Sequence, residues 1–290
     1  MTISACKDFE RRIIRWSHDR PDILATVVIG SYARMSPPAD DYSDLDLILF
    51  SLDPSLYTAT SAWLHELGEL WIATLNYIGP GDPEWLALFE GGIKADLLFV
   101  AAESDRLPAQ MLAALPYQDV LARGVRVIYS GASEHQESSF PSASVSKTDL
   151  PSEQIFEATV NNALFAAERF AKFVRRGDFW RSQTVAIADL RRHMLILIEW
   201  HAQFHAEMKL DTWYDGRFME KWADARVLDS LRDLDFGSDS VDKHSALSKA
   251  LKLIEWLATE TAARLGYAFP TPGQSKAFAW LNDMSPHDGR

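Results

Sequence analysis

The sequence has a single cysteine, Cys6, and fewer basic than acidic residues. One cysteine excludes an internal disulfide and any cysteine-rich metal site. The 29 lysines and arginines are outnumbered by 41 aspartates and glutamates, which gives a formal net charge of -12 over 290 residues. Such a charge repels polyanions, so we expect no nucleic acid partner, whereas a small cationic molecule would be attracted.

Long hydrophobic runs are also missing. No stretch approaches the roughly eighteen uncharged apolar residues that a membrane-spanning helix needs, so we expect no membrane partner. The N-terminal segment carries charged side chains, among them Asp8, Arg12 and Asp19, and lacks the apolar centre of a signal peptide. The sequence therefore predicts a cytoplasmic protein.

The pattern of apolar residues changes at a serine-rich segment over residues 130–151, which is typical of a linker. Before it, short β-branched runs between glycines and prolines predict a domain over residues 1–135, with a small mixed sheet of about four or five strands. After it, apolar residues at helical spacing predict an α-helical bundle over residues 150–290. The expected fold class is α/β of the α+β type, with a C-terminal helical domain.

The expected elements follow from these patterns and from the glycines and prolines that bound them. The expected strands cover residues 25–29, 44–50, 70–78, 85–89 and 93–100, the last two as a hairpin, and the expected helices cover residues 54–67, 152–177, 181–208 and 245–265.

Three aspartates in apolar strands are the main functional signal. Side chains alternate along a strand, so Asp44 and Asp46 should share one face, while the intervening leucines point the other way. Asp96 interrupts another apolar strand, where an unpaired charge would be costly. Clustered carboxylates are ligands for Mg²⁺, which also binds substrate phosphates. The sequence therefore predicts a metal-binding, catalytic triad of Asp44, Asp46 and Asp96.

A glycine-serine turn precedes the paired aspartates. Gly30 would let a phosphate approach the backbone, and the hydroxyl of Ser31 could donate a hydrogen bond to it. Arg34 could add a charge-assisted contact. These three residues are the predicted nucleotide-binding group.

The combination of Gly30-Ser31, Asp44-Leu45-Asp46 and Asp96 resembles the nucleotidyltransferase superfamily of the DNA polymerase β type, over about residues 23–100. The resemblance implies a polymerase-β-like N-terminal domain. It also implies that the three aspartates bind metal and that the glycine-serine turn binds the nucleotide phosphates.

Segments spread over the rest of the chain are similar to the aminoglycoside 6-adenylyltransferases, the streptomycin adenylyltransferase family. They are Leu88-Phe89-Glu90-Gly91-Gly92, Leu190-Arg191-Arg192-His193-Met194-Leu195, Ile198-Glu199-Trp200, Gly216-Arg217-Phe218-Met219-Glu220-Lys221-Trp222 and Arg264-Leu265-Gly266-Tyr267. Tyr32 and Leu45 stand where the family pattern has arginine and tyrosine. The resemblance implies Mg²⁺-dependent transfer of AMP from ATP to a hydroxyl of an aminoglycoside such as streptomycin, with release of pyrophosphate, which inactivates the antibiotic.

Other functions remain open at this point. The acceptor could be another small molecule or a protein side chain, or the chain could be a non-catalytic nucleotide-binding module. Retention of all three aspartates argues against the last of these, because an unused buried carboxylate cluster costs stability. A monomer and a homodimer are both compatible with the sequence.

The helical half has two further sets of side chains that could take part in chemistry. Asp189 is a candidate general base for the acceptor hydroxyl, although a solvated helix face explains it equally well. His201 and His205 are four residues apart on an expected helix, but Ala202 stands where the zinc-protease motif needs glutamate. Packing or surface roles are therefore the favoured interpretation for both histidines.

Overall fold

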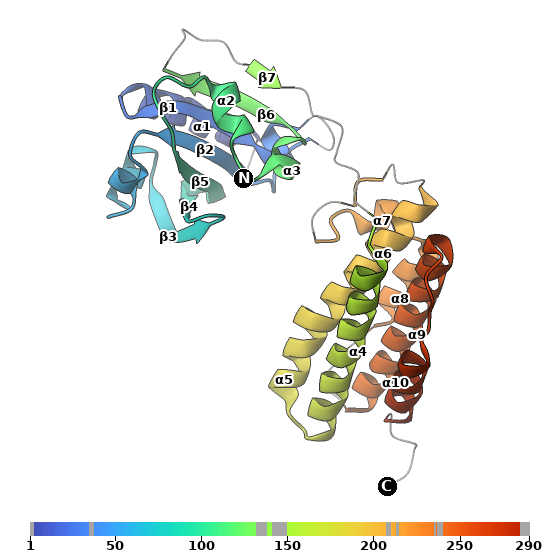
Figure 1. Cartoon of the computed structure of the whole chain (residues 1–290). Helices are drawn as coiled ribbons and strands as arrows, with labels where there is room; N and C mark the ends of the chain where they lie inside the picture. The colour runs from blue at the N-terminus through green and yellow to red at the C-terminus, as the bar shows by residue number, and fades with distance from the viewer. Residues whose placement is uncertain are drawn as a thin grey trace. The chain divides into compact units, whose positions relative to one another are not determined.

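The computed structural model describes residues 3–34, 38–131, 138–140, 150–206, 210–212, 215–234, 236 and 240–284. The chain divides into two compact units, Met1–Ser146 and Lys147–Arg290, which are described separately here. All the strands lie in the first unit and the long helices of the bundle in the second (Figure 1). The expected α/β fold class with a C-terminal helical region is therefore confirmed.

One mixed sheet forms the centre of the first unit, with its strands in the order β3-β4-β5-β2-β1-β6-β7. The strands are β1 (Ile23–Ile29), β2 (Leu45–Ser51), β3 (Leu70–Ile78), β4 (Asp82–Phe89), β5 (Ile93–Ala101), β6 (Val125–Ser130) and β7 (Ser138–Phe140). β2 and β5 are parallel, and the other neighbouring pairs are antiparallel. The pair that carries the predicted aspartates is thus the parallel one.

The expected number of four or five strands was wrong, because the sheet of the described residues has seven, and neither β6 nor β7 was expected. β7 lies inside the segment predicted as a linker, and at three residues it is too short to show an alternating pattern. It is defined by its antiparallel pairing with β6, a tertiary contact. Of the rest of the predicted linker, Ser130 is the last residue of β6, residues 131, 150 and 151 lie outside strands and helices, and residues 132–137 and 141–149 lie outside the described residues.

Helices cover both faces of the sheet. α1 (Ile3–His18) lies on one face, and α2 (Pro108–Ala113) lies on the other, followed by α3 (Gln118–Leu121) (Figure 1). Alternate residues of β2 divide between the two cores accordingly. Leu45, Leu47 and Leu49 share a cluster with Phe9 and Ile13 of α1, whereas Ile48 and Phe50 share one with Met111, Leu112 and Leu121.

The helix expected over residues 54–67 was also wrong. The structure has two short 3₁₀ helices instead, η2 (Pro54–Tyr57) and η3 (Ala62–Glu66). Between them, the hydroxyl of Thr58 donates to the carbonyl of Ser55 at 3.0 Å, and that of Thr60 accepts from the amide of Ala62 at 3.2 Å. The two hydroxyls thus bind the carbonyl of Ser55 and the amide of Ala62, which would pair with other backbone groups in a continuous helix. The helix is therefore interrupted.

The second unit is a helical bundle. Its elements are α4 (Glu153–Arg175), α5 (Phe179–Thr184), the π-helical η5 (Val185–Leu190), α6 (Arg191–His205), α7 (Met219–Trp222), α8 (Ala225–Arg232), α9 (Ser240–Leu265) and α10 (Pro272–Asp283). The helix expected over residues 181–208 corresponds to α5, η5 and α6, and its last two residues lie outside the described residues. The shorter α7, α8 and α10 were not expected.

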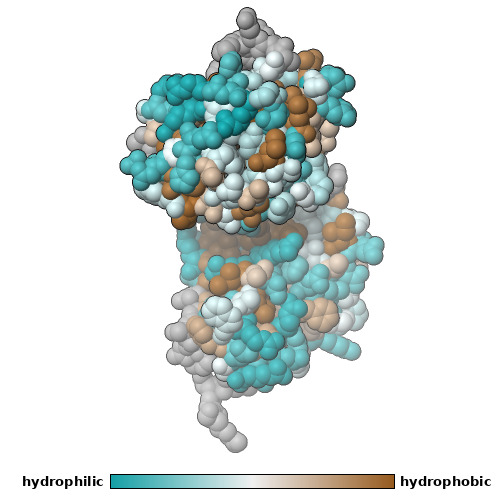
Figure 2. Space-filling view, turned by 90° about the vertical axis from the view of Figure 1, so that its left-hand side faces the viewer, coloured by the Kyte–Doolittle hydropathy of each residue, from teal (hydrophilic) through white to brown (hydrophobic). Residues whose placement is uncertain are grey.

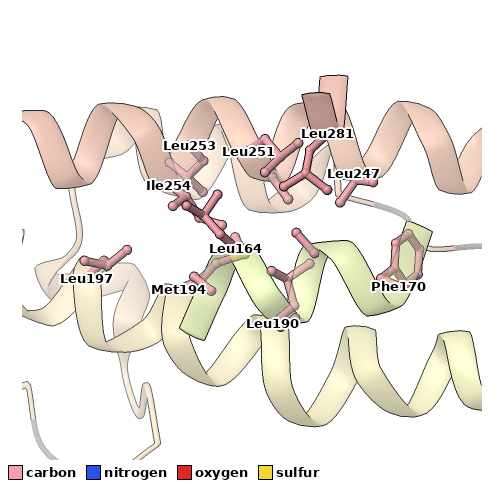
Figure 3. Packing of buried hydrophobic residues seen from close by; sticks show 14 of the residues in the cluster. Leu164, Phe170, Leu190, Met194, Leu197, Leu247, Leu251, Leu253, Ile254 and Leu281 are labelled. Carbon is pink, nitrogen blue, oxygen red and sulfur yellow. The ribbon is translucent and has the colours of Figure 1, made fainter. Parts of the chain in front are cut away.

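Hydrophobic side chains from four helices form the core of this bundle. Leu164 and Phe170 of α4, Met194 and Leu197 of α6, Leu251 and Ile254 of α9, and Leu281 of α10 belong to one buried cluster (Figure 3). Burying each such side chain contributes about 1.5–3 kcal/mol. The long helices are therefore held by a shared core, which fixes the faces that their polar residues present.

The face drawn in Figure 2 is largely hydrophilic, with hydrophobic residues in small separate groups. None of the described helices combines the length and the apolar composition that a membrane span requires.

Candidate active site

The predicted aspartates lie on and beside the parallel pair of strands. Asp46 of β2 and Asp96 of β5 are register partners, so the two residues stand side by side on neighbouring strands. Asp44 immediately precedes β2. Because side chains alternate, Asp46 is on the opposite face from Leu45 and Leu47, which are buried against α1. Parallel pairing and alternation together bring the predicted residues to one place on the sheet.

A lysine joins two of these carboxylates. The ammonium of Lys94 donates to Oδ2 of Asp44 at 2.7 Å and to Oδ2 of Asp96 at 3.0 Å. Lys94 is two residues before Asp96 on β5 and therefore shares its face. Although burial acts against it, the hydrogen bonds to Asp44 and Asp96 raise the pKa of Lys94. The chain thus supplies one positive charge of its own to the carboxylate group.

Negative charge still exceeds positive charge at this position. Burial, followed by the charges of Asp96 and Asp44, raises the pKa of Asp46 to about 7. Burial also raises the pKa of Asp96, against the opposing effect of Lys94. Oδ1 of Asp96 is buried and has no hydrogen-bond partner among the described residues. A carboxylate oxygen without a partner, among charges that are not balanced, is the environment that a bound cation stabilises.

Glu84 adds a fourth carboxylate on this side of the sheet. It belongs to β4 and is the register partner of Leu98, two residues beyond Asp96, so it shares the face of the aspartates. Burial, followed by the charge of Asp96, raises the pKa of Glu84. Neither Glu84 nor Lys94 is among the site residues predicted from the sequence, although alternation along a strand places Lys94 on the same face as Asp96.

The glycine-serine turn is the 3₁₀ helix η1 (Gly30–Tyr32), directly after β1. Gly30 has φ +67°, and a Cβ at this position would lie 2.2 Å from Oδ2 of Asp46. The hydroxyl of Ser31 donates to the carbonyl of Asp44 at 3.4 Å. Ser31 and Arg34 are both buried. The structure thus brings Gly30 and Ser31 to the aspartates, and the phosphate-binding role of this turn stays a prediction.

The donors in this group suit a hard divalent cation. The side chains of Asp44, Asp46, Asp96 and Glu84 offer only carboxylate oxygens, which Mg²⁺ prefers over nitrogen or sulfur ligands. The chemistry of these donors therefore fits a magnesium ion.

The helical unit has a cavity of about 660 Å³ whose lining includes Arg191, Asp215 and Met219. Glu199 of α6 is close enough to Asp215 for that charge to add to burial in raising the pKa of Glu199 to about 7. Asp189, the candidate general base, forms an ion pair with Arg169 of α4 at 2.6 Å, and both side chains are about half exposed. The cavity is large enough for a small-molecule ligand.

Comparisons with known proteins address the family. The chain matches the family model described as streptomycin adenylyltransferase over residues 5–284. A search of curated proteins found no match. Among solved structures, the chain is similar to an aminoglycoside 6-adenyltransferase from Bacillus subtilis, with 13% identity, a TM-score of 0.44, and coverage of 94% of this chain and 95% of the other. The family match covers nearly the whole sequence and confirms the resemblance predicted from it. The chain belongs to the streptomycin adenylyltransferase family, and with it to the nucleotidyltransferases.

Proposed function

We propose that this protein transfers AMP from ATP to a hydroxyl group of an aminoglycoside such as streptomycin and releases pyrophosphate, in the cytoplasm. The observation that carries the proposal is the register of Asp46 with Asp96 on neighbouring parallel strands, with Asp44 joined to the same group through Lys94. Membership of the streptomycin adenylyltransferase family supports the transfer of AMP to an aminoglycoside, and ATP is the donor in this proposal.

Asp44, Asp46 and Asp96 are the proposed metal ligands and catalytic residues. A divalent cation bound there, Mg²⁺ in this proposal, supplies positive charge to the phosphates and helps to align the hydroxyl with the α-phosphate. Gly30 leaves the carboxylate of Asp46 room to take its position. Ser31 holds the turn against the backbone of Asp44. Arg34 is proposed to add positive charge beside the triphosphate.

Each unit has its own proposed role. The nucleotidyltransferase domain proposed over residues 1–135 would bind ATP, because it carries the carboxylates and the glycine-serine turn. The helical domain proposed over residues 150–290 would bind the acceptor in the cavity lined in part by Arg191, Arg192 and Asp215. Asp215 is the acidic residue among the charged residues that line the cavity, so it is the proposed contact for a cationic group of the acceptor. The net charge of -12 also attracts such a ligand.

Mass spectrometry tests the activity directly. The full chain is incubated with Mg²⁺, ATP and a panel of aminoglycosides that includes streptomycin. The expected product is streptomycin with one added AMP, formed together with pyrophosphate. Absence of this product with Asp46→Asn would show that its formation depends on the carboxylate of Asp46. The absence of an adduct on every aminoglycoside would contradict the proposed acceptor. AMP on the protein itself would instead favour a protein side chain as the acceptor.

A further inference from the structure

Two histidines and a glutamate meet on neighbouring helices of the second unit. His201 and His205 are one turn apart on α6, and Glu260 lies on α9. Nε2 of His201 is 2.8 Å from Oε2 of Glu260, and Nε2 of His205 is 3.5 Å from the same oxygen. The two Nε2 atoms are 3.2 Å apart. Three potential ligand atoms therefore form a small triangle.

Hydrogen bonding alone does not satisfy this triangle. Each neutral imidazole carries one N–H, and the ionised carboxylate has none to donate. A hydrogen on Nε2 of His201 can point to Glu260 or to His205, but one hydrogen serves only one of these contacts well. If both Nε2 atoms carry hydrogens directed at Glu260, the two N–H groups face one another across 3.2 Å. One shared cation would replace all three competing contacts.

The dimensions match a tetrahedral metal site. At metal–ligand distances of 2.0–2.1 Å, two ligands of tetrahedral zinc are about 3.4 Å apart. The observed separations of 2.8, 3.2 and 3.5 Å lie around this value. Small adjustments of two partly exposed side chains, His205 and Glu260, suffice to centre an ion.

The surroundings orient the ligands and leave an entry path. Nε1 of Trp256 donates to the other oxygen of Glu260, Oε1, at 2.7 Å, which holds the carboxylate toward the histidines. The ring of Trp256 also packs on His201, with centroids 4.7 Å apart. His201 is 2% exposed, whereas the side chains of His205 and Glu260 are 47% and 41% exposed. An ion can therefore enter from the solvent side, where water can fill a fourth position.

We propose that His201, His205 and Glu260 bind a transition-metal ion of the zinc class, with water as the fourth ligand, and that this ion links α6 to α9. Imidazole nitrogen suits zinc, nickel and copper, whereas the oxygen-only group around Asp46 suits Mg²⁺. The site is separate from the proposed transferase chemistry and does not depend on it. Since the ligands lie on two packed helices, binding stabilises the folded bundle.

The test uses the untagged, full-length chain, because a histidine tag would bind the same ions. After removal of metals with a chelator, Co²⁺ is titrated in an excess of Mg²⁺, which competes for the carboxylate group. The expected result is one Co²⁺ per chain, with the intense visible absorption of a tetrahedral site, and displacement of this Co²⁺ by Zn²⁺. Zn²⁺ is also expected to raise the melting temperature.

Variants locate the ion. His205→Ala and Glu260→Gln are each expected to weaken Zn²⁺ binding at least tenfold and to remove most of its effect on melting. His18→Ala and Glu255→Gln, which change an exposed histidine and an exposed glutamate elsewhere, are the matched controls and should bind as the wild type does. Asp46→Asn should also keep the tetrahedral spectrum. Circular dichroism of the metal-free variants verifies their folding.

Two outcomes overturn the proposal. One is the absence of stoichiometric Co²⁺ and Zn²⁺ binding to the wild type, which would make the triangle a hydrogen-bonded helix contact only. The other is equal affinity in wild type and His205→Ala, which would assign the ion to other residues.

Discussion

The backbone of Gly30 and the carboxylate of Asp46 lie so close that a Cβ on residue 30 would be 2.2 Å from Oδ2 of Asp46. Gly30 also has φ +67°, a conformation that costs an alanine roughly 1–2 kcal/mol. We expect Gly30→Ala to displace Asp46 as well as to strain the turn. The expected result is loss of most AMP transfer, measured by the mass-spectrometric assay, together with a lower free energy of unfolding.

Gly177→Ala separates these two effects. Gly177 ends α4 with φ +69°, and no atom lies within 4 Å of a Cβ built there. This variant should therefore lose stability through backbone strain alone and keep its activity. Equal loss of activity in Gly30→Ala and Gly177→Ala would contradict the importance of the contact with Asp46.

Lys94 is expected to compete with Mg²⁺ for the same oxygens. Its ammonium contacts Asp44 and Asp96 at 2.7 and 3.0 Å, so a metal ion at these oxygens must displace it. In Lys94→Met the metal-free carboxylates lose their internal counter-charge. We expect the variant to melt at a lower temperature without metal, and Mg²⁺ to raise its melting temperature more than that of the wild type.

Lys172→Met is the control, because it removes an ion pair with Glu168 within α4, in the helical unit. Its response to Mg²⁺ should equal that of the wild type. An unchanged response in Lys94→Met would show that Lys94 and the metal do not share ligands.

The shared face of Asp44 and Asp46 and the choice of Asp96 could be predicted from sequence because both depend on local rules. Alternation placed Asp44 and Asp46 on one face, and the cost of a lone charge in an apolar strand singled out Asp96. Their side-by-side position depends on the parallel pairing of β2 with β5, residues that are far apart in sequence. No local pattern contains that pairing.

The residues that were missed depend on such distant contacts. Glu84 reaches the face of the aspartates only through the pairing of β4 with β5. Glu260 is 59 residues from His201 and meets it because α6 and α9 pack together. The zinc-protease motif concerns positions on one helix only, and Ala202 stands at its glutamate position. Helix packing, which the sequence pattern shows only as an apolar stripe, supplied the missing group.

Asp46→Asn is expected to separate activity from stability. Asparagine keeps the size of the side chain but removes a partly buried charge that lies among other carboxylates. Loss of a metal ligand should lower kcat by at least about a hundredfold. The metal-free variant should melt no lower than the wild type, because it loses electrostatic repulsion.

Differential scanning fluorimetry with and without Mg²⁺ measures the second effect, and the stabilisation by Mg²⁺ should disappear in Asp46→Asn. Asp119→Asn, an exposed aspartate of α3, should behave as the wild type in both assays. Turnover near the wild-type value in Asp46→Asn would mean that the aspartates are wrongly assigned.

Glu199 should make the stability of the chain depend on pH. Burial, followed by the charge of Asp215, raises its pKa from 4.5 to about 7, so the folded chain binds this proton more tightly than the unfolded chain does. The resulting stability is complete below the unfolded pKa and is lost as the pH rises through about 7. Glu199→Gln should therefore increase the free energy of unfolding by on the order of 1–3 kcal/mol at about pH 8, and by much less at about pH 5. Urea unfolding at both pH values measures this difference.

The matched variant Glu255→Gln, at an exposed position of α9, should have the same small effect on the free energy of unfolding at both pH values. An effect of Glu199→Gln that is equal at the two pH values would show that its carboxyl group ionises alike in the folded and unfolded chains.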